Sequence, residues 1–93
     1  MVEQGRKRGT FRFSIAPGNG AKKVCLAGDF NDWQPQRLRK RPGGEFVAIV
    51  PLEPGTYEYK FVVDGEWTVD PDTSAWAANE FGTFNSVLRV ESK

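Results

Sequence analysis

Alternation of apolar and polar residues is the clearest pattern along the chain. Phe11, Phe13 and Ile15 are separated by Arg12 and Ser14, a period of two that predicts a half-buried β-strand. Other segments rich in aliphatic, β-branched or aromatic residues are also predicted as strands: residues 23–27, 45–50, 56–63, and 83 or 84 to 90. The basic stretch 37–41 is compatible with one more short strand. Because no segment has a helical period, we expect an all-β chain.

The Asp64-Gly65 dipeptide lies between two of these strand-like segments and predicts a tight hairpin with a two-residue turn. In such a hairpin Val62 lies opposite Trp67, and Lys60 lies opposite Val69. Directly opposed residues share a face, so Lys60 and Trp67 are expected on one face of the sheet, the solvated one. The residues between them alternate to the other face and form the expected core stripe: Tyr57, Tyr59, Phe61 and Val63.

The spacing of the strands predicts the architecture. Strand signals recur about every ten residues, with clusters of Gly, Pro, Asn and Asp between them, which is typical of an antiparallel β-sandwich of about seven strands. We expect one domain over residues 10–91, preceded by a flexible basic leader over residues 1–9. The chain length of 93 residues also fits a single domain.

Composition excludes several classes of protein. The net charge is only +1 and charged residues make up 27% of the chain, which argues against a strongly basic nucleic-acid binder and against a wholly disordered chain. Cys25 is the only cysteine and lies in the apolar run 24–27, so we expect a buried, unreactive thiol and no disulfide within the chain. No apolar stretch resembles a signal peptide or a membrane span, which favours a cytoplasmic location without a membrane partner.

The three tryptophans are the candidate binding residues. Trp33 follows a run of turn residues in which Phe30 is expected to face the core, so Trp33 is either a lid at the end of the sandwich or part of a binding site. Trp67 either covers its neighbouring valines or contacts a ligand. Trp76 lies in an expected loop of small residues, 72–79, where plugging the sandwich edge and touching a ligand are equally compatible with the pattern. Flat indoles beside amide and ammonium donors suit a sugar.

The sequence does not predict a catalytic centre. It has no histidine, and its lone cysteine lies in a predicted strand; no Gly-rich phosphate loop or metal-ligand cluster appears. Glycoside hydrolysis requires two carboxylates about 5–10 Å apart, but turn chemistry already explains five candidate aspartates: Asp29, Asp32, Asp64, Asp70 and Asp72. We therefore expect no enzymatic activity, no metal and no cofactor.

Four blocks of residues together resemble a known family. They are Gly28-Asp29-Phe30-Asn31-Asp32-Trp33, Tyr59-Lys60-Phe61-Val62-Val63-Asp64-Gly65-Glu66-Trp67, Asp70-Pro71 and Gly82-Thr83-Phe84-Asn85-Ser86-Val87-Leu88. In order and spacing they are similar to the glycogen-binding domain of AMP-activated protein kinase beta subunits. More broadly, they resemble carbohydrate-binding module family 48, which also precedes the barrels of glycogen branching and debranching enzymes. The resemblance runs from about residue 10 to residue 90.

The resemblance implies an immunoglobulin-like, early-set β-sandwich that binds α-1,4-linked glucan without cleaving it. In the kinase-type modules two tryptophans stack on successive glucose rings, and their positions match Trp33 and Trp67. A lysine in the strand before the hairpin bonds sugar hydroxyls and matches Lys60. The implied ligands are glycogen, starch, maltooligosaccharides and cyclodextrins, and a kinase or a glucan-processing enzyme is the implied protein partner.

The remaining implied site residues lie near the last strand. Phe81 occupies the place where the kinase modules usually carry a leucine that reaches over the ligand. The threonine and asparagine that follow in the family match Thr83 and Asn85. The loop over residues 70–81 departs from the family by about one extra residue and contains Trp76.

Two alternatives to glucan binding belong to other classes. The cations of residues 6–8 and 37–41, together with exposed tryptophans, are also compatible with single-stranded nucleic acid, although the near-zero net charge disfavours it. A scaffold or protein-interaction sandwich with a vestigial sugar site is the second alternative. The arrangement of Trp33 and Trp67 discriminates between the readings, because an active sugar site requires both indoles to be exposed to one common groove.

Overall fold

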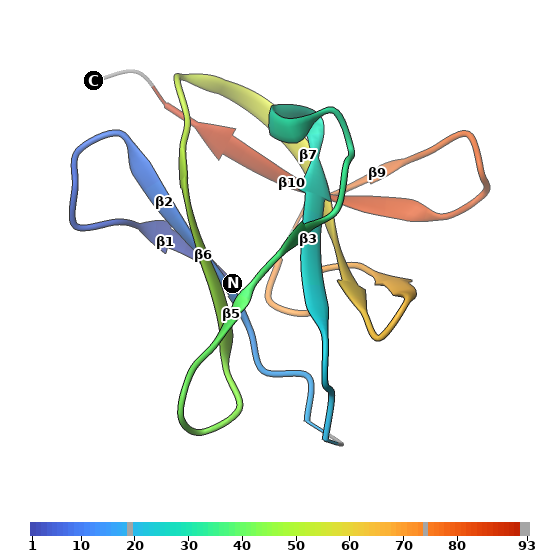
Figure 1. The fold of residues 1–93 in the computed structure, drawn as a ribbon. Coiled ribbons are helices and arrows are strands. Elements are labelled where there is room, and N and C mark those ends of the chain that lie inside the picture. Colours follow the sequence, from blue (N-terminus) through green and yellow to red (C-terminus); the bar gives the residue numbers. More distant parts are fainter. Residues whose placement is uncertain (19, 74, 92–93) are drawn as a thin grey trace.

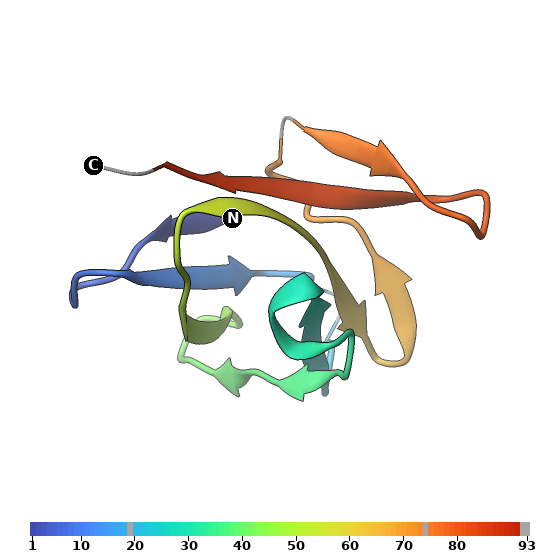
Figure 2. The same cartoon turned by 90° about the horizontal axis from the view of Figure 1, so that it is seen from above.

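The computed structural model describes residues 1–18, 20–73 and 75–91, which form two packed antiparallel sheets (Figures 1 and 2). The first sheet has the order β1-β2-β6-β5, with β1 at Val2–Gln4, β2 at Thr10–Ile15, β6 at Phe46–Pro51 and β5 at Arg39–Lys40. The second has the order β4-β3-β7-β10-β9, with β4 at Gln36–Arg37, β3 at Val24–Gly28, β7 at Gly55–Val63, β10 at Phe84–Val90 and β9 at Trp76–Ala78. Strand β8, Glu66–Thr68, pairs with β7.

This arrangement confirms the predicted all-β sandwich. The five strands expected from the hydrophobic pattern are all present, with ends that differ by one or two residues. The described residues form ten strands rather than about seven, because short edge strands add to those with a strong pattern. The basic stretch 37–41 contributes to two strands in different sheets, β4 and β5. Leu38 lies between them with its side chain in the core, so the chain crosses between the sheets there.

Strand β1 differs from the expected leader. Val2 pairs with Phe13 and Gln4 pairs with Phe11, which adds β1 to the edge of the first sheet. The ammonium group of Met1 donates to both carboxylate oxygens of Asp70, at 2.8 and 2.7 Å. Residues 2–4 therefore form part of the sandwich, whereas the expectation placed them outside it.

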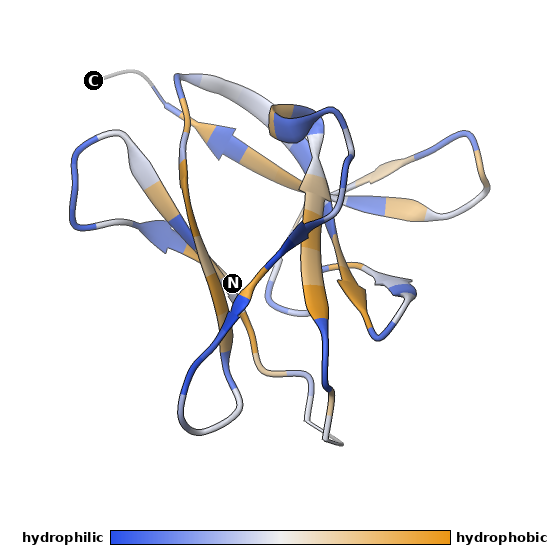
Figure 3. Ribbon diagram, in the orientation of Figure 1, coloured by the Kyte–Doolittle hydropathy of each residue, from blue (hydrophilic) through white to orange (hydrophobic). Residues whose placement is uncertain are grey.

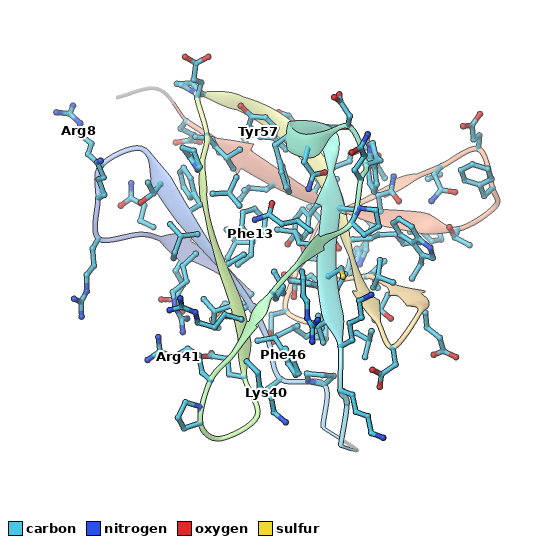
Figure 4. The ribbon with its side chains drawn as sticks, in the orientation of Figure 1. Arg8, Phe13, Lys40, Arg41, Phe46 and Tyr57 are labelled. Atoms are coloured by element: carbon cyan, nitrogen blue, oxygen red, sulfur yellow. The ribbon has the colours of Figure 1, made fainter. Side chains whose placement is uncertain are left out.

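Large side chains from both sheets fill the space between them. Phe13 of β2 packs edge-on against Tyr59 of β7, with ring centroids 5.2 Å apart, and Phe30 packs against Phe13 at 5.3 Å. The stripe expected on β7 is confirmed, since Tyr59 and Phe61 are fully buried while Tyr57 and Val63 pack against the core. Apolar residues follow the strands and polar residues the connections (Figure 3), and Phe13 lies between the layers (Figure 4). Cys25 is buried, as expected.

The β7–β8 hairpin has the predicted turn. Asp64 and Gly65 both have positive φ, 48° and 90°, and Val62 pairs with Trp67. The ladder ends with the pair Phe61–Thr68, one pair short of the expected Lys60–Val69 pair. Strand β10 pairs with the first half of β7, along residues 55–59, so β8 and β10 follow one another along β7.

Strand β9 occupies part of the segment expected as a loop. It pairs with the start of β10, where Ser86 lies opposite Trp76 and Phe84 opposite Ala78. The β9–β10 hairpin extends away from the β1–β2 hairpin in both views (Figures 1 and 2). Among the residues that the structure describes, no helix is long and apolar enough to cross a membrane.

Candidate functional site

A groove of about 840 Å³ on the second sheet brings together all six residues proposed from the sequence. It lies over β7 and is bordered by the loop after β3, by β8 and by the turn between β9 and β10. The residues that line it are Asp29, Trp33, Glu58, Lys60, Trp67, Asn79, Glu80, Phe81, Thr83 and Asn85. The chain segments that supply them are separated by up to fifty residues in sequence, so only the fold places them together.

Trp33 is held by the loop that follows β3. A single turn of 3-10 helix, Asp29–Asn31, leads into it, and the Trp33 amide donates to the Gly28 carbonyl at 3.0 Å. The indole Nε1 of Trp33 donates to Asp29 Oδ1 at 2.9 Å, while Asp29 Oδ2 accepts a bond of 2.7 Å from the backbone amide of Glu58. Asp29 thereby fixes the indole to strand β7.

The two indoles form one surface. The ring centroids of Trp33 and Trp67 are 6.5 Å apart and their planes are inclined by 39°. Trp67 is half exposed, and Trp33 is partly buried by its own loop. Both line the same groove, which is the arrangement that the sugar-site hypothesis requires and that a lid at the end of the sandwich does not.

Lys60 is placed differently from the expectation. The hairpin register predicts the correct face, but the side chain is only 8% exposed rather than solvated. Its Nζ donates to Thr83 Oγ1 at 3.1 Å. An ammonium group has three donor hydrogens, and this is the one acceptor found for it within the described residues. Two donors therefore remain for groups that enter the space beside Lys60.

Asn79 organises the other wall of the groove. Its Oδ1 accepts bonds from the backbone amides of Phe81 and Thr83, at 3.0 and 3.2 Å. Its Nδ2 donates to Thr83 Oγ1 at 2.8 Å and to Asn85 Oδ1 at 3.0 Å. Asn85 Nδ2 donates in turn to Glu58 Oε1 at 3.0 Å. Asn85 still has one free amide hydrogen and one free lone pair in this network.

Phe81 projects from the turn between β9 and β10. Its side chain is 82% exposed, and Gly82 beside it has a φ of 79°, a left-handed conformation that glycine adopts without strain. An apolar ring presented in this way at the rim of a groove has no packing partner in the core. It is available to cover a ligand that lies on the indoles.

Sequence reasoning missed three polar residues of the groove: Asp29, Glu58 and Asn79. Asp29 was assigned to turn chemistry alone, because its bond to the Trp33 indole depends on a contact four residues along a folded loop. Asn79 carried a usable signal, since asparagine three residues before glycine is typical of a tight turn. The carboxylates of Asp29 and Glu58 both accept hydrogen bonds from neighbouring groups of the protein.

The basic residues lie on the other sheet, away from the indoles. Arg6, Lys7, Arg12, Arg39 and Arg41 surround a separate hollow over β1, β2 and β6. Figure 4 shows Arg8 and Arg41 pointing outward on this side of the molecule. The nucleic-acid alternative requires cations and tryptophans on one surface, and the structure separates them. No three His, Cys, Asp or Glu side chains gather around a common point among the described residues.

Comparison with known proteins assigns the family. A family model described as the glycogen recognition site of AMP-activated protein kinase matches residues 11–93. The 5'-AMP-activated protein kinase subunit beta-1 of Sus scrofa is 42% identical over 72 residues, which cover 77% of this chain and 57% of that protein. The beta-1 subunit of Bos taurus is 43% identical over 72 residues and 26% of its length. This chain thus spans little more than half, or about a quarter, of those relatives.

A solved structure shares the fold. The maltogenic amylase from S. marinus superposes with a TM-score of 0.73 and 26% sequence identity, over 90% of this chain and 14% of the amylase chain. The region of similarity in the kinase subunits and in the amylase is therefore a domain of a longer protein. From the family match and the identity to the beta-1 subunits, we conclude that this chain belongs to the family of the glycogen recognition site of AMP-activated protein kinase.

Proposed function

We propose that this domain is a non-catalytic module that binds α-1,4-linked glucan in the groove over β7. The observation that carries the proposal is the common groove of Trp33 and Trp67, whose ring centroids are 6.5 Å apart. The names of the related kinase subunits and of the amylase, together with the family description, support a glucan as the ligand class.

The chemistry of the groove matches the chemistry of a glucose ring. A pyranose has an apolar face of C–H groups and a rim of hydroxyls. Its face packs on an indole, while the free donors of Lys60 and Asn85 bond its rim. The planes of the two indoles are inclined to each other by 39°, which suits a chain whose successive rings turn relative to one another.

Weak binding at a single site is expected. At about 25 cal/mol per Å² of apolar area removed from water, each stacked ring contributes on the order of 1–2 kcal/mol, offset by the ordering of a flexible chain. The dissociation constant is then roughly micromolar to millimolar. Such affinity suits a polymer with many chain ends, where repeated attachment raises the effective concentration.

The test is a titration with maltoheptaose or β-cyclodextrin, followed by tryptophan fluorescence and amide NMR shifts. We expect saturable shifts at Trp33, Lys60 and Trp67, and loss of binding in Trp33→Ala and Trp67→Ala with the fold retained. Ile49→Ala is the matched control, because Ile49 is an exposed apolar residue of β6 on the other sheet. No shift at millimolar sugar would favour the alternative of a scaffold with a vestigial site.

A further inference from the structure

A second hollow, of about 670 Å³, adjoins the groove on the far side of Trp67. We call it the notch; it is lined by Lys60, Trp67, Thr68, Val69, Trp76, Thr83 and Phe84. It opens between the end of β8 and the start of β10, where the β7–β8 ladder has stopped and β8 departs from the sheet. The resemblance to known modules assigns no ligand to Trp76 or Phe84.

The apolar lining of the notch is exposed to solvent. Trp76 and Phe84 are each 56% exposed, which is unusual for large aromatic side chains. Among the described residues six large hydrophobic side chains are exposed, and four of them line the groove or the notch: Trp67, Trp76, Phe81 and Phe84. Apolar exposure is thus concentrated around Trp67, and such a concentration marks a binding surface.

The notch and the groove share three residues. Lys60, Trp67 and Thr83 line both hollows, so a ligand that leaves the groove past the Trp67 indole enters the notch. The buried ammonium of Lys60 lies at this junction with one acceptor, Thr83 Oγ1, and two further donors. These donors are suited to the hydroxyls of a sugar on either side.

We propose that the notch is an additional glucosyl subsite, in which Trp76 and Phe84 contact a further ring of the same α-glucan that lies on Trp33 and Trp67. The proposal rests on the proposed function, since it extends the same ligand past Trp67. An indole, a phenyl ring and a shared ammonium repeat in the notch the combination of flat faces and donors found in the groove. Chains long enough to fill both hollows then bind more tightly than short ones.

The experiment compares maltotriose with maltoheptaose, using NMR of the indole N–H groups and calorimetric titration. We expect both sugars to shift the Trp67 indole signal, whereas only maltoheptaose shifts that of Trp76. Trp76→Ala is expected to weaken maltoheptaose binding about tenfold, the loss of roughly one stacked ring, and to leave maltotriose binding unchanged. Phe84→Ala is expected to act in the same direction.

Trp76→Phe keeps a flat ring and should restore most of the affinity for maltoheptaose, which separates ring contact from a general effect on β9. Ile49→Ala, on the other sheet, should change neither sugar. If the wild type binds both sugars but Trp76→Ala and Phe84→Ala bind maltoheptaose normally, or lose both sugars equally, the subsite is wrong while glucan binding stands. If the wild type binds neither sugar, both the subsite and the proposed function are wrong.

Discussion

At the scale of single residues, Trp33 combines an exposed role with an unfavourable backbone. Its φ is 59°, and that of Asp32 before it is 56°, both in the left-handed region that bulky residues seldom adopt. The amide bond to Gly28 and the indole bond to Asp29 hold it there. A conformation that costs energy and presents an indole to a groove is typical of a residue retained for binding rather than for stability.

This backbone predicts a difference between two substitutions. Trp33→Gly should be more stable than Trp33→Ala by about 1 kcal/mol, because glycine adopts a positive φ without steric cost. Both should lose glucan binding, since neither carries an indole. Urea unfolding compares the two stabilities and a maltoheptaose titration checks binding. An alanine variant as stable as the glycine variant would show that the strain is relieved in solution.

At the scale of elements, the junction between β3 and the 3-10 turn sets the position of the first indole. Gly28 is the last residue of β3 and has an extended backbone that any residue adopts. A Cβ there would lie 2.7 Å from the carbonyl oxygen of Glu58 and 2.7 Å from Cε2 of Phe30. Glycine is needed because β7 and the Phe30 ring pass too closely for a side chain. The turn that carries Trp33 is built on this contact.

We therefore expect Gly28→Ala to destabilise the domain by about 1–3 kcal/mol and to weaken glucan binding, because Phe30 and the following turn must move. Gly43→Ala is the control. Gly43 has a φ of 92° with no atom within 4 Å of the added Cβ, so that change costs only the conformational term of about 1 kcal/mol. Thermal unfolding and titration of both variants check this. Equal loss of affinity in the two would contradict the steric explanation.

At the scale of the whole molecule, Tyr59 joins the two sheets to the chain that follows β8. Its ring packs against Phe13 of the facing sheet, and its hydroxyl donates to Asp70 Oδ2 at 2.7 Å. Asp70 is itself buried, and its backbone amide donates to Ser86 Oγ at 2.7 Å. Burial raises the pKa of the Tyr59 phenol well above its usual value, and the hydrogen bond to Asp70 and the negative charge of Asp70 raise it further.

This shift predicts how stability depends on pH. The folded state keeps Tyr59 protonated, whereas the unfolded chain ionises near pH 10, so the stabilisation is complete below about pH 10 and is lost progressively above it. Tyr59→Phe should cost about 1–3 kcal/mol at neutral pH, because it removes a donor from the buried Asp70 carboxylate. Its stability should then fall less steeply than that of the wild type above pH 10.

The control is Tyr57→Phe, which removes a hydroxyl that donates to the Glu53 carbonyl at the surface. Denaturant unfolding between pH 7 and 11 compares the three proteins. The alkaline loss of stability should persist in Tyr57→Phe. If Tyr59→Phe loses stability above pH 10 as steeply as the wild type, the dependence arises from other groups.

Local pattern carried much of this structure. Alternation along β2 and β7 predicted which side chains enter the core, since a strand places successive residues on opposite faces whatever surrounds it. The Asp64-Gly65 turn predicted the register that puts Trp67 beside Val62, because a two-residue loop leaves one pairing. The six candidate site residues came from the family resemblance, and the fold brings them into one groove.

Sequence by itself thus determined the fold class, the core stripe, the hairpin and the residues that line the groove. Tertiary structure alone decided that residues 2–4 and 76–78 are edge strands, because backbone pairing leaves little trace in side-chain order. It also decided that Lys60 is buried and that Asp29 holds the Trp33 indole. Burial and hydrogen bonding depend on segments distant in the chain, and the position of the notch beside the groove depends on where β8 leaves the sheet.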